Sequence, residues 1–205
     1  GNETMMDGEA EVNIHTDMTR QLQNVRDVGS DISVGETVLK EGTLISAVEV
    51  GLLATIGVTR VKCYKKPVVG VMSTGNELVE PDFAGTLPVG KIRDSNRAAL
   101  LNALVEDGYQ PMDLGIIGDS MATLKAAFVK ATSQCDVIIT SGGVSMGDAD
   151  LVKPLLEEMG TVHFGRINMK PGKPTTFATI SATDNRSVLF FGLPGNPVSC
   201  LVTKE

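Results

Sequence analysis

The residues best suited to chemistry are acids that follow a glycine-containing loop. Asp148 and Asp150 come shortly after Ser141-Gly142-Gly143, which ends a β-branched apolar run at residues 137–140. Adjacent glycines permit positive φ and let a ligand approach the backbone. A strand, a glycine loop and a helix start form a site for an anion, and carboxylates beside it indicate a bridging divalent cation. The simpler alternative is a tight turn in which Asp148 caps the following helix, and the glycines alone favour it.

A second group of residues could neutralise an oxyanion. Lys170 and Lys173 flank a Pro-Gly turn within residues 169–174, and the turn fixes the direction of both ammonium groups. Lysine is a compact point charge suited to a tetrahedral anion. The alternative, an exposed turn with two solvated lysines, fits this motif equally well. Together with the acids and glycine loops, the lysines indicate metal-assisted phosphate chemistry. Hydroxyl donors are available from three residues: Thr140, Ser145 and Ser199.

Residues 67–205 must form the elements that position these groups. Short apolar runs predict strands at residues 68–72, 112–117, 137–140, 162–164, 175–180 and 188–191. Helical spacing predicts helices at 97–106 and 121–131, a helix that includes Leu151 to Met159, and a last one from about Val198. This alternation predicts a Rossmann-like, three-layer αβα domain with a mostly parallel sheet.

Polar, glycine-containing loops follow four of these expected strands, at residues 73–75, 118–119, 141–143 and 194–197. The carboxyl ends of parallel strands share one edge of a sheet, so we expect the loops to converge in one crevice. For two acids near them, Asp94 and Asp119, the simpler role is a helix cap. The edge carries further charged residues: Glu77, Lys91, Arg93, Arg97 and Arg166.

The N-terminal third has a different character. Residues 1–24 are polar and acidic with poor periodicity, which predicts a flexible or partly extended leader. Residues 25–66 predict a small β-rich module, because 31–43 alternate apolar and polar residues between glycines and 58–63 form a further apolar strand. A helix at 48–56 is expected between them, with Ser46 as its N-cap and Gly57 as its stop.

Composition excludes several functions. The net charge of −7, the absence of tryptophan and an aromatic content of 4% disfavour nucleic-acid binding and base stacking. Three widely spaced cysteines and two histidines indicate a reducing compartment and no structural zinc. No apolar run approaches membrane-spanning length, and a cytoplasmic location is expected.

Several motifs in the same order resemble one known family. They are Glu-Val-Gly-Leu-Leu-Ala-Thr-Ile-Gly-Val at 49–58, Val-Met-Ser-Thr-Gly-Asn-Glu-Leu at 71–78, Lys-Ile-Arg-Asp-Ser-Asn-Arg at 91–97, Thr-Ser-Gly-Gly-Val-Ser-Met-Gly-Asp at 140–148, Met-Lys-Pro-Gly-Lys-Pro at 169–174 and Leu-Pro-Gly-Asn-Pro-Val-Ser at 193–199. From about Val25 onward the chain resembles the molybdenum-insertion enzymes of molybdenum cofactor synthesis. These enzymes form the MoeA family, which includes the C-terminal E domain of gephyrin.

The resemblance implies a reaction and a role for each matching residue. Such enzymes cleave AMP from adenylylated molybdopterin in a Mg²⁺-dependent step and place molybdate on the dithiolene sulfurs. By similarity Asp150 is the key acid, with Asp94, Asp119 and Asp148 around the metal and pyrophosphate; Asp119 and Asp150 are the expected metal ligands. Lys170, Lys173 and Ser199 would bind molybdate. The implied substrate-binding residues are Thr74, Gly75, Ser141, Gly142, Gly143, Ser145, Pro194 and Pro197.

The resemblance leaves two other functions open. One is a molybdopterin adenylyltransferase, since those enzymes resemble this chain around 141–144, although the 25–66 module and the lysine turn argue against it. The other is a gephyrin-like scaffold that clusters inhibitory receptors. Family members have further N-terminal and C-terminal parts, so the chain is expected to be a fragment. The full-length form is expected to be a homodimer, and an upstream adenylyltransferase domain is an open question.

Overall fold

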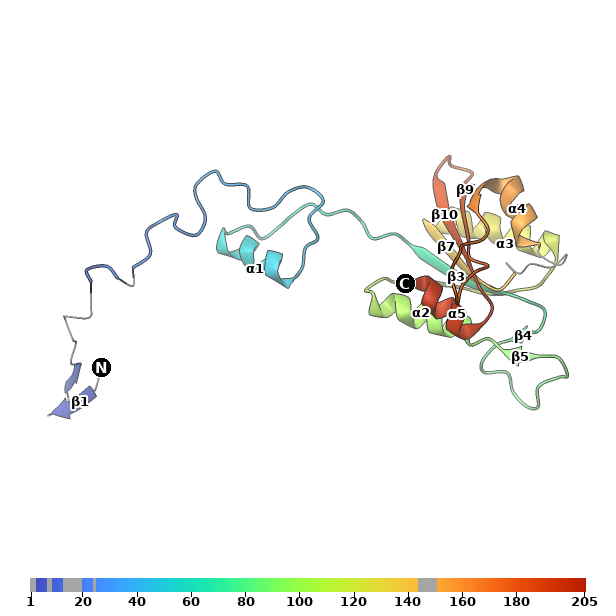
Figure 1. Ribbon diagram of the computed structural model, residues 1–205, viewed down its shortest axis with the longest axis horizontal. Coiled ribbons are helices and arrows are strands. Elements are labelled where there is room, and N and C mark those ends of the chain that lie inside the picture. Colours follow the sequence, from blue (N-terminus) through green and yellow to red (C-terminus); the bar gives the residue numbers. More distant parts are fainter. Residues whose placement is uncertain (1–2, 7–8, 13–19, 24, 144–150) are drawn as a thin grey trace. The chain divides into compact units, whose positions relative to one another are not determined.

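The computed structural model describes residues 3–6, 9–12, 20–23, 25–143 and 151–205 (Figure 1). The chain forms two compact units, Gly1–Cys63 and Tyr64–Glu205. The division lies three residues before the boundary expected between residues 66 and 67. Within the described residues, no helix has both the length and the apolar character needed to cross a bilayer.

In the described residues of the first unit, two short paired strands and one helix form. Strands β1 (Glu3–Met6) and β2 (Glu9–Val12) pair antiparallel, within the part expected to be a leader. Helix α1 (Ala47–Thr55) begins at Ser46, as expected: the Ser46 hydroxyl accepts from the Val48 amide, and the Glu49 carboxylate accepts from the Ser46 amide at 2.8 Å. The hydrogen bonds from Ser46 lower the pKa of Glu49. This reciprocal pattern satisfies two amides that lack partners within the helix.

The predicted β-rich module does not contain strands. No strand forms between residues 25 and 66, and no side chain in that range is buried. The predictions of strands within 31–43 and at 58–63 are therefore wrong. An alternating sequence provides two faces, but a strand also needs a neighbouring backbone to pair with and a surface against which to bury its apolar side.

The second unit is built on a six-stranded sheet. The spatial order is β6 (Met112–Ile117), β3 (Val69–Thr74), β7 (Val137–Ser141), β10 (Ser187–Leu193), β9 (Thr176–Ser181) and β8 (Gly160–Phe164). The first four strands are mutually parallel, and β9 runs antiparallel to both of its neighbours. Five of the six strands therefore point the same way, which confirms the mostly parallel prediction.

Helices cover both faces of this sheet (Figure 1). Helices α3 (Met121–Gln134) and α4 (Val152–Met159) pack on one face, where Phe128 and Phe190 are fully buried with ring centroids 5.3 Å apart. Helices α2 (Asn96–Glu106) and α5 (Pro197–Lys204) cover the other face around Val71 and Leu100. The three-layer αβα architecture is therefore confirmed. A small parallel pair, β4 (Leu78–Val79) and β5 (Ile92–Arg93), lies outside this sheet.

Two predicted caps are wrong. Helix α4 has Leu151 rather than Asp148 at its N-cap position, because Pro154 is tolerated in a first turn but would block a helix that began earlier. Asp148 itself lies outside the described residues. Helix α3 is capped by Ser120, whose hydroxyl accepts from the Thr123 amide at 3.2 Å, and not by Asp119.

Candidate functional site

The candidate site lies where the connections of the sheet change direction. After β3 the chain crosses to β6, which is the outer strand on one side of β3. After β7 it crosses in the other direction, to β8 at the far edge of the sheet. The helix after β3 and the helix after β7 therefore lie on opposite faces, and a crevice opens between the two strand ends. Ser73 and Ser141 are aligned in register at these ends. Thr74 and the glycine loop lie at this crevice, which confirms the expected convergence.

The glycine loop after β7 has a backbone that only glycine can adopt there. Gly142 and Gly143 have φ of 83° and 68°. A Cβ on Gly142 would lie 2.7 Å from the Thr74 carbonyl oxygen, and one on Gly143 would lie 2.8 Å from Val152. The Gly142 amide donates to the Leu193 carbonyl at 3.1 Å, which joins this loop to the end of β10. The loops after three adjacent strands are thus held against one another.

A cavity of about 100 Å³ opens between these loops. Its lining includes Thr74, Glu77, Asn96, Ser141 and Gly195. The side-chain oxygens of Thr74 and Asn96 are buried and have no hydrogen-bond partner among the described residues, and the same holds for the nearby Thr140 hydroxyl. Buried polar atoms without partners are costly, and a ligand in this cavity could supply the missing hydrogen bonds.

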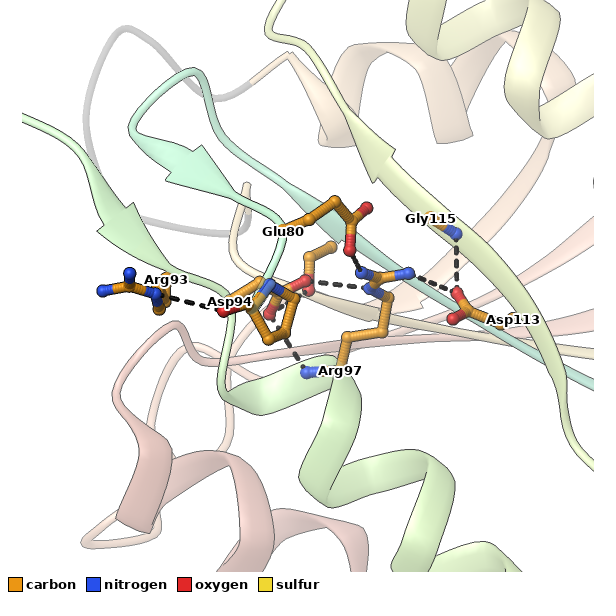
Figure 2. A network of polar contacts seen from close by, with 8 residues as sticks. Glu80, Arg93, Asp94, Arg97, Asp113 and Gly115 are labelled. Carbon is orange, nitrogen blue, oxygen red and sulfur yellow. Dashed lines mark hydrogen bonds and ion pairs between the residues drawn. The ribbon is translucent and has the colours of Figure 1, made fainter. Parts of the chain in front are cut away.

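Helix α2 begins beside the cavity and is anchored by a buried arginine. The Arg97 side chain is only 7% exposed, and Figure 2 shows its guanidinium between three carboxylates. It is 2.9 Å from Asp94 and 2.5 Å from Asp113, and it also pairs with Glu80. Burial alone would lower the pKa of Arg97, but the hydrogen bonds with these carboxylates raise it. The guanidinium therefore stays charged and joins α2 to β6 and to the segment after β4.

Asp94 is already fully engaged by its neighbours. One carboxylate oxygen accepts from the Ser73 hydroxyl at 3.0 Å and from the Arg97 amide at 3.1 Å, and the other accepts from the Arg97 guanidinium. The residue is 2% exposed. Ser95 occupies the N-cap position of α2 but makes no side-chain cap bond, so Asp94 supplies it. Asp94 thus positions the start of α2, and its implied role around a metal stays a prediction.

Asp119 lies on the loop after β6 and joins it to the loop after β3. Its carboxylate accepts from the Asn76 amide at 2.9 Å, while the Asn76 side chain accepts from the Asp119 amide at 3.1 Å. Gly75 donates to the Ile117 carbonyl at 3.2 Å next to this pair. Asp119 is exposed and therefore remains accessible at the same edge of the sheet.

A larger hollow of about 590 Å³ lies elsewhere, at the start of β6 and the end of α2. It is lined by residues such as Leu101, Tyr109 and Pro111, and none of the loops that follow strands at the glycine-rich edge reaches it. Size alone would favour this hollow. The chemistry favours the smaller cavity, because the glycine loops and the unpartnered buried oxygens lie there.

Comparison with known proteins identifies the family. A model described as "Probable molybdopterin binding domain" matches residues 70–205. The chain belongs to this molybdopterin-binding family. A second model, the MoeA N-terminal region (domain I and II), matches residues 2–57. The resemblance to the MoeA family is confirmed.

Relatives of this molybdopterin-binding chain are longer. A protein named gephyrin from Dictyostelium discoideum is 45% identical over 98% of this chain and 31% of its own length. A molybdopterin molybdenumtransferase from Haemophilus influenzae is 43% identical over 92% of this chain and 45% of its own length. The crystal structure of a MoeA protein from Pyrococcus horikosii matches with a TM-score of 0.67 and 38% identity, over 84% of this chain and 41% of that one. The chain spans less than half the length of each of these three proteins.

The lysine turn of this molybdopterin-binding domain lies at the same edge of the sheet. Strand β8 points the same way as β10, so the loop that follows it begins at the same edge of the sheet as the glycine loops, on the outermost strand. The loop closes through a 3.0 Å bond from the Ile167 amide to the Lys173 carbonyl. Lys170 and Lys173 are exposed and do not line the cavity. Their ammonium groups have no ion pair among the described residues, so they remain available to an anion.

Three other bases expected at the edge already have partners within the chain. Arg97 is buried among carboxylates, Arg93 donates to the Pro81 and Phe83 carbonyls at 3.1 and 3.2 Å, and Lys91 donates to the Asn76 carbonyl. Sequence reasoning missed their partners, because Glu80 and Asp113 carry no motif. The position of Arg97 one helical turn after Asp94 was the available signal.

The remaining predicted site residues either lie at the end of β10 and the start of α5 or fall outside the described residues. Pro194 is buried, and Pro197 and Ser199 lie in the first turn of α5. The Asn196 side chain caps this turn by accepting from the Val198 and Ser199 amides at 3.1 and 3.2 Å. Ser145, Asp148 and Asp150 lie outside the described residues. Within the part of the chain that is described, no group of three His, Cys, Asp or Glu side chains could hold a metal ion. The Mg²⁺ site at Asp119 and Asp150 stays a prediction.

The two buried thiols, Cys135 and Cys200, are expected to be unreactive. Cys200 and Cys135 are 1% and 0% exposed, whereas Cys63 is exposed. Burial raises the pKa of the Cys200 thiol, although a hydrogen bond with Ser141 works against this, and burial also raises the pKa of Cys135. At pH 8 we expect iodoacetamide to label Cys63 rapidly and to label Cys135 and Cys200 only after unfolding. Mass spectrometry counts the labelled thiols. Rapid labelling of two or three thiols would contradict the buried positions.

The same thiols predict a pH dependence. An unfolded cysteine releases its proton near pH 8.5, while the folded chain keeps the protons of Cys135 and Cys200 to higher pH. The folded state then binds more protons than the unfolded state, so the free energy of unfolding should fall as the pH rises above about 8.5. Urea unfolding at pH 7.5 and 9.5 measures this.

Proposed function

We propose that this chain is the molybdopterin-binding part of a molybdopterin molybdenumtransferase. In this proposal the whole enzyme cleaves adenylylated molybdopterin to AMP and molybdopterin and places molybdate on the dithiolene sulfurs. The observation that carries it is the cavity at the change of strand direction, lined by Thr74, Asn96 and the glycine loop, with buried oxygens that lack partners. The named transferase relatives and the matched MoeA N-terminal region support the same function.

The glycine loop is the proposed anion site. The Gly143 amide has no acceptor among the described residues, and a side chain at either glycine would meet Thr74. The Gly143 amide could therefore donate to a phosphate, since anions bind to backbone amides at such loops. The first amides of α5 are taken by Asn196, so that helix start is a weaker candidate.

The acids are proposed to act on the phosphate bond. Magnesium, if held by Asp119 and Asp150, would neutralise charge on the pyrophosphate. The described residues support only part of this: Asp119 is exposed at the correct edge, with one carboxylate oxygen engaged by the Asn76 amide. In this chain Asp119 also holds the loops after β3 and β6 together, which is a positioning role independent of any metal.

Lys170 and Lys173 are proposed to bind molybdate. Replacing Lys170 with alanine in the full-length protein should raise the molybdate concentration needed for AMP release about 10- to 100-fold, because one charged hydrogen bond is lost. Release of AMP from adenylylated molybdopterin, measured against molybdate concentration with Mg²⁺ present, tests this. Lys125→Ala is the matched control, because Lys125 is a half-exposed lysine that pairs with Glu158 on the α3–α4 face.

The outcomes separate the proposals. Equal molybdate dependence in Lys170→Ala and Lys125→Ala would remove Lys170 from the molybdate site. The variant Asp150→Asn should abolish AMP release without changing molybdate binding. No AMP release from folded full-length protein would overturn the transferase.

Similarity to the Dictyostelium gephyrin fits an enzyme or a scaffold, so the AMP-release assay is needed to distinguish these two functions. The match of residues 2–57 to the MoeA N-terminal region favours the transferase over an adenylyltransferase. The homodimer stays a prediction.

A further inference from the structure

Asn96 joins two loops of the site through one amide group. Its side-chain nitrogen donates to the Ser141 hydroxyl at 2.7 Å and to the Gly195 carbonyl at 2.8 Å. Ser141 ends β7, and Gly195 lies in the loop after β10. The amide must point its nitrogen toward Gly195, because a backbone carbonyl can only accept. The two loops that bound the cavity are therefore held at one separation by a single side chain.

The oxygen of the same amide has no partner among the described residues. Asn96 Oδ1 is buried and accepts no hydrogen bond within the described residues, and Asn96 lines the cavity. A buried acceptor without a donor destabilises the protein. Joining the two loops requires only the amide nitrogen, so that role does not explain why the oxygen is buried without a donor. An N–H or O–H donor on a bound ligand would satisfy this oxygen.

We propose that Asn96 is a ligand-binding and positioning residue of this site. Its nitrogen fixes the distance between the loops after β7 and β10, and its oxygen accepts a hydrogen bond from the bound molybdopterin derivative. The ligand assignment rests on the proposed function, whereas the positioning of the loops rests on the two measured distances alone.

The variant Asn96→Ala tests the ligand contact, because alanine lacks the amide oxygen. Aspartate keeps an oxygen that can accept from the ligand but cannot donate to the Gly195 carbonyl, so Asn96→Asp removes the bond between the loops and leaves an acceptor in place. A negative charge at the first position of α2 favours the helix, so Asn96→Asp should retain its fold. The dissociation constant for adenylylated molybdopterin, measured by titration calorimetry, should rise about tenfold or more in Asn96→Ala. Asn102→Ala on the same helix is the control, because the Asn102 amide donates to Ala98 within α2. It should bind as the unchanged chain does.

Hydrogen exchange tests the positioning. In Asn96→Asp, amides at 142–143 and 195–196 should exchange faster, while those of α3 should not change. Asn96→Ala removes the same bonds without adding charge and must give the same result. Equal affinity of Asn96→Ala and the unchanged chain, or unchanged exchange at both loops, would overturn the inference. Failure of the unchanged chain to bind would overturn the proposed function instead, and the exchange measurement would still decide the positioning.

Discussion

Replacing Arg97 with leucine is expected to lower the free energy of unfolding by about 3–5 kcal/mol. The substitution removes the guanidinium from between three carboxylates (Figure 2) and leaves the buried Asp94 carboxylate without its charged partner. A buried charge that has lost its partner costs far more than the intact pair contributes. Urea unfolding followed by circular dichroism measures the change, provided that the dependence on urea stays the same.

Arg186 offers a matched control for this prediction. It also pairs with two carboxylates, Asp136 at 3.1 Å and Asp184 at 2.7 Å, but its side chain is 41% exposed. Solvent already screens these pairs, so Arg186→Leu should destabilise the chain much less. Equal effects of Arg97→Leu and Arg186→Leu would contradict a special role for the buried network.

Replacing Gly142 with alanine is expected to cost about 2–5 kcal/mol of stability and to abolish ligand binding. Two effects add: alanine at a φ of 83° is strained by about 1–2 kcal/mol, and its Cβ, 2.7 Å from the Thr74 carbonyl oxygen, forces a backbone shift that costs about 1–3 kcal/mol. That shift would separate the loops after β3 and β7, which bound the cavity. Thermal unfolding and calorimetric titration with adenylylated molybdopterin measure the two consequences.

Gly85 isolates the first of these effects. It has nearly the same φ, 84°, but nothing lies within 4 Å of a Cβ built on it. Gly85→Ala should therefore show only the backbone strain, about 1–2 kcal/mol, and should bind the ligand normally. If Gly142→Ala were no worse than Gly85→Ala, close packing against Thr74 would not be what keeps residue 142 a glycine.

The order of strands and helices in the second unit could be predicted because its signals are local. Strand β6 and the start of α3 occur where predicted, and the buried apolar run at 137–140 became β7, longer by one residue. Each element is defined by periodicity and by a turn residue close in sequence. The glycine loops could be placed for a related reason, since the parallel order of the strands brings their carboxyl ends to one edge.

Charged residues were harder to assign, because their partners are distant in sequence. Arg97 looked available to a ligand, yet Glu80 and Asp113, 17 and 16 residues away, occupy it. Asn96 lay within the motif at 91–97 but was not assigned a role, and its bond to Gly195, 99 residues later, could not be foreseen. The alternation at 31–43 misled for the converse reason: a strand-like pattern does not supply a pairing partner.

Periodicity, glycine placement and motif order were enough to establish the αβα class and the family, and to predict the edge of the sheet that carries the candidate site. The pairing of charges, the separation of the glycine loops and the availability of each acid and base emerged only from the folded arrangement. The physical reason is the range of the interactions. Secondary structure follows from neighbours within a few residues, whereas a buried hydrogen bond or ion pair depends on which distant segments the packed sheet and helices bring together.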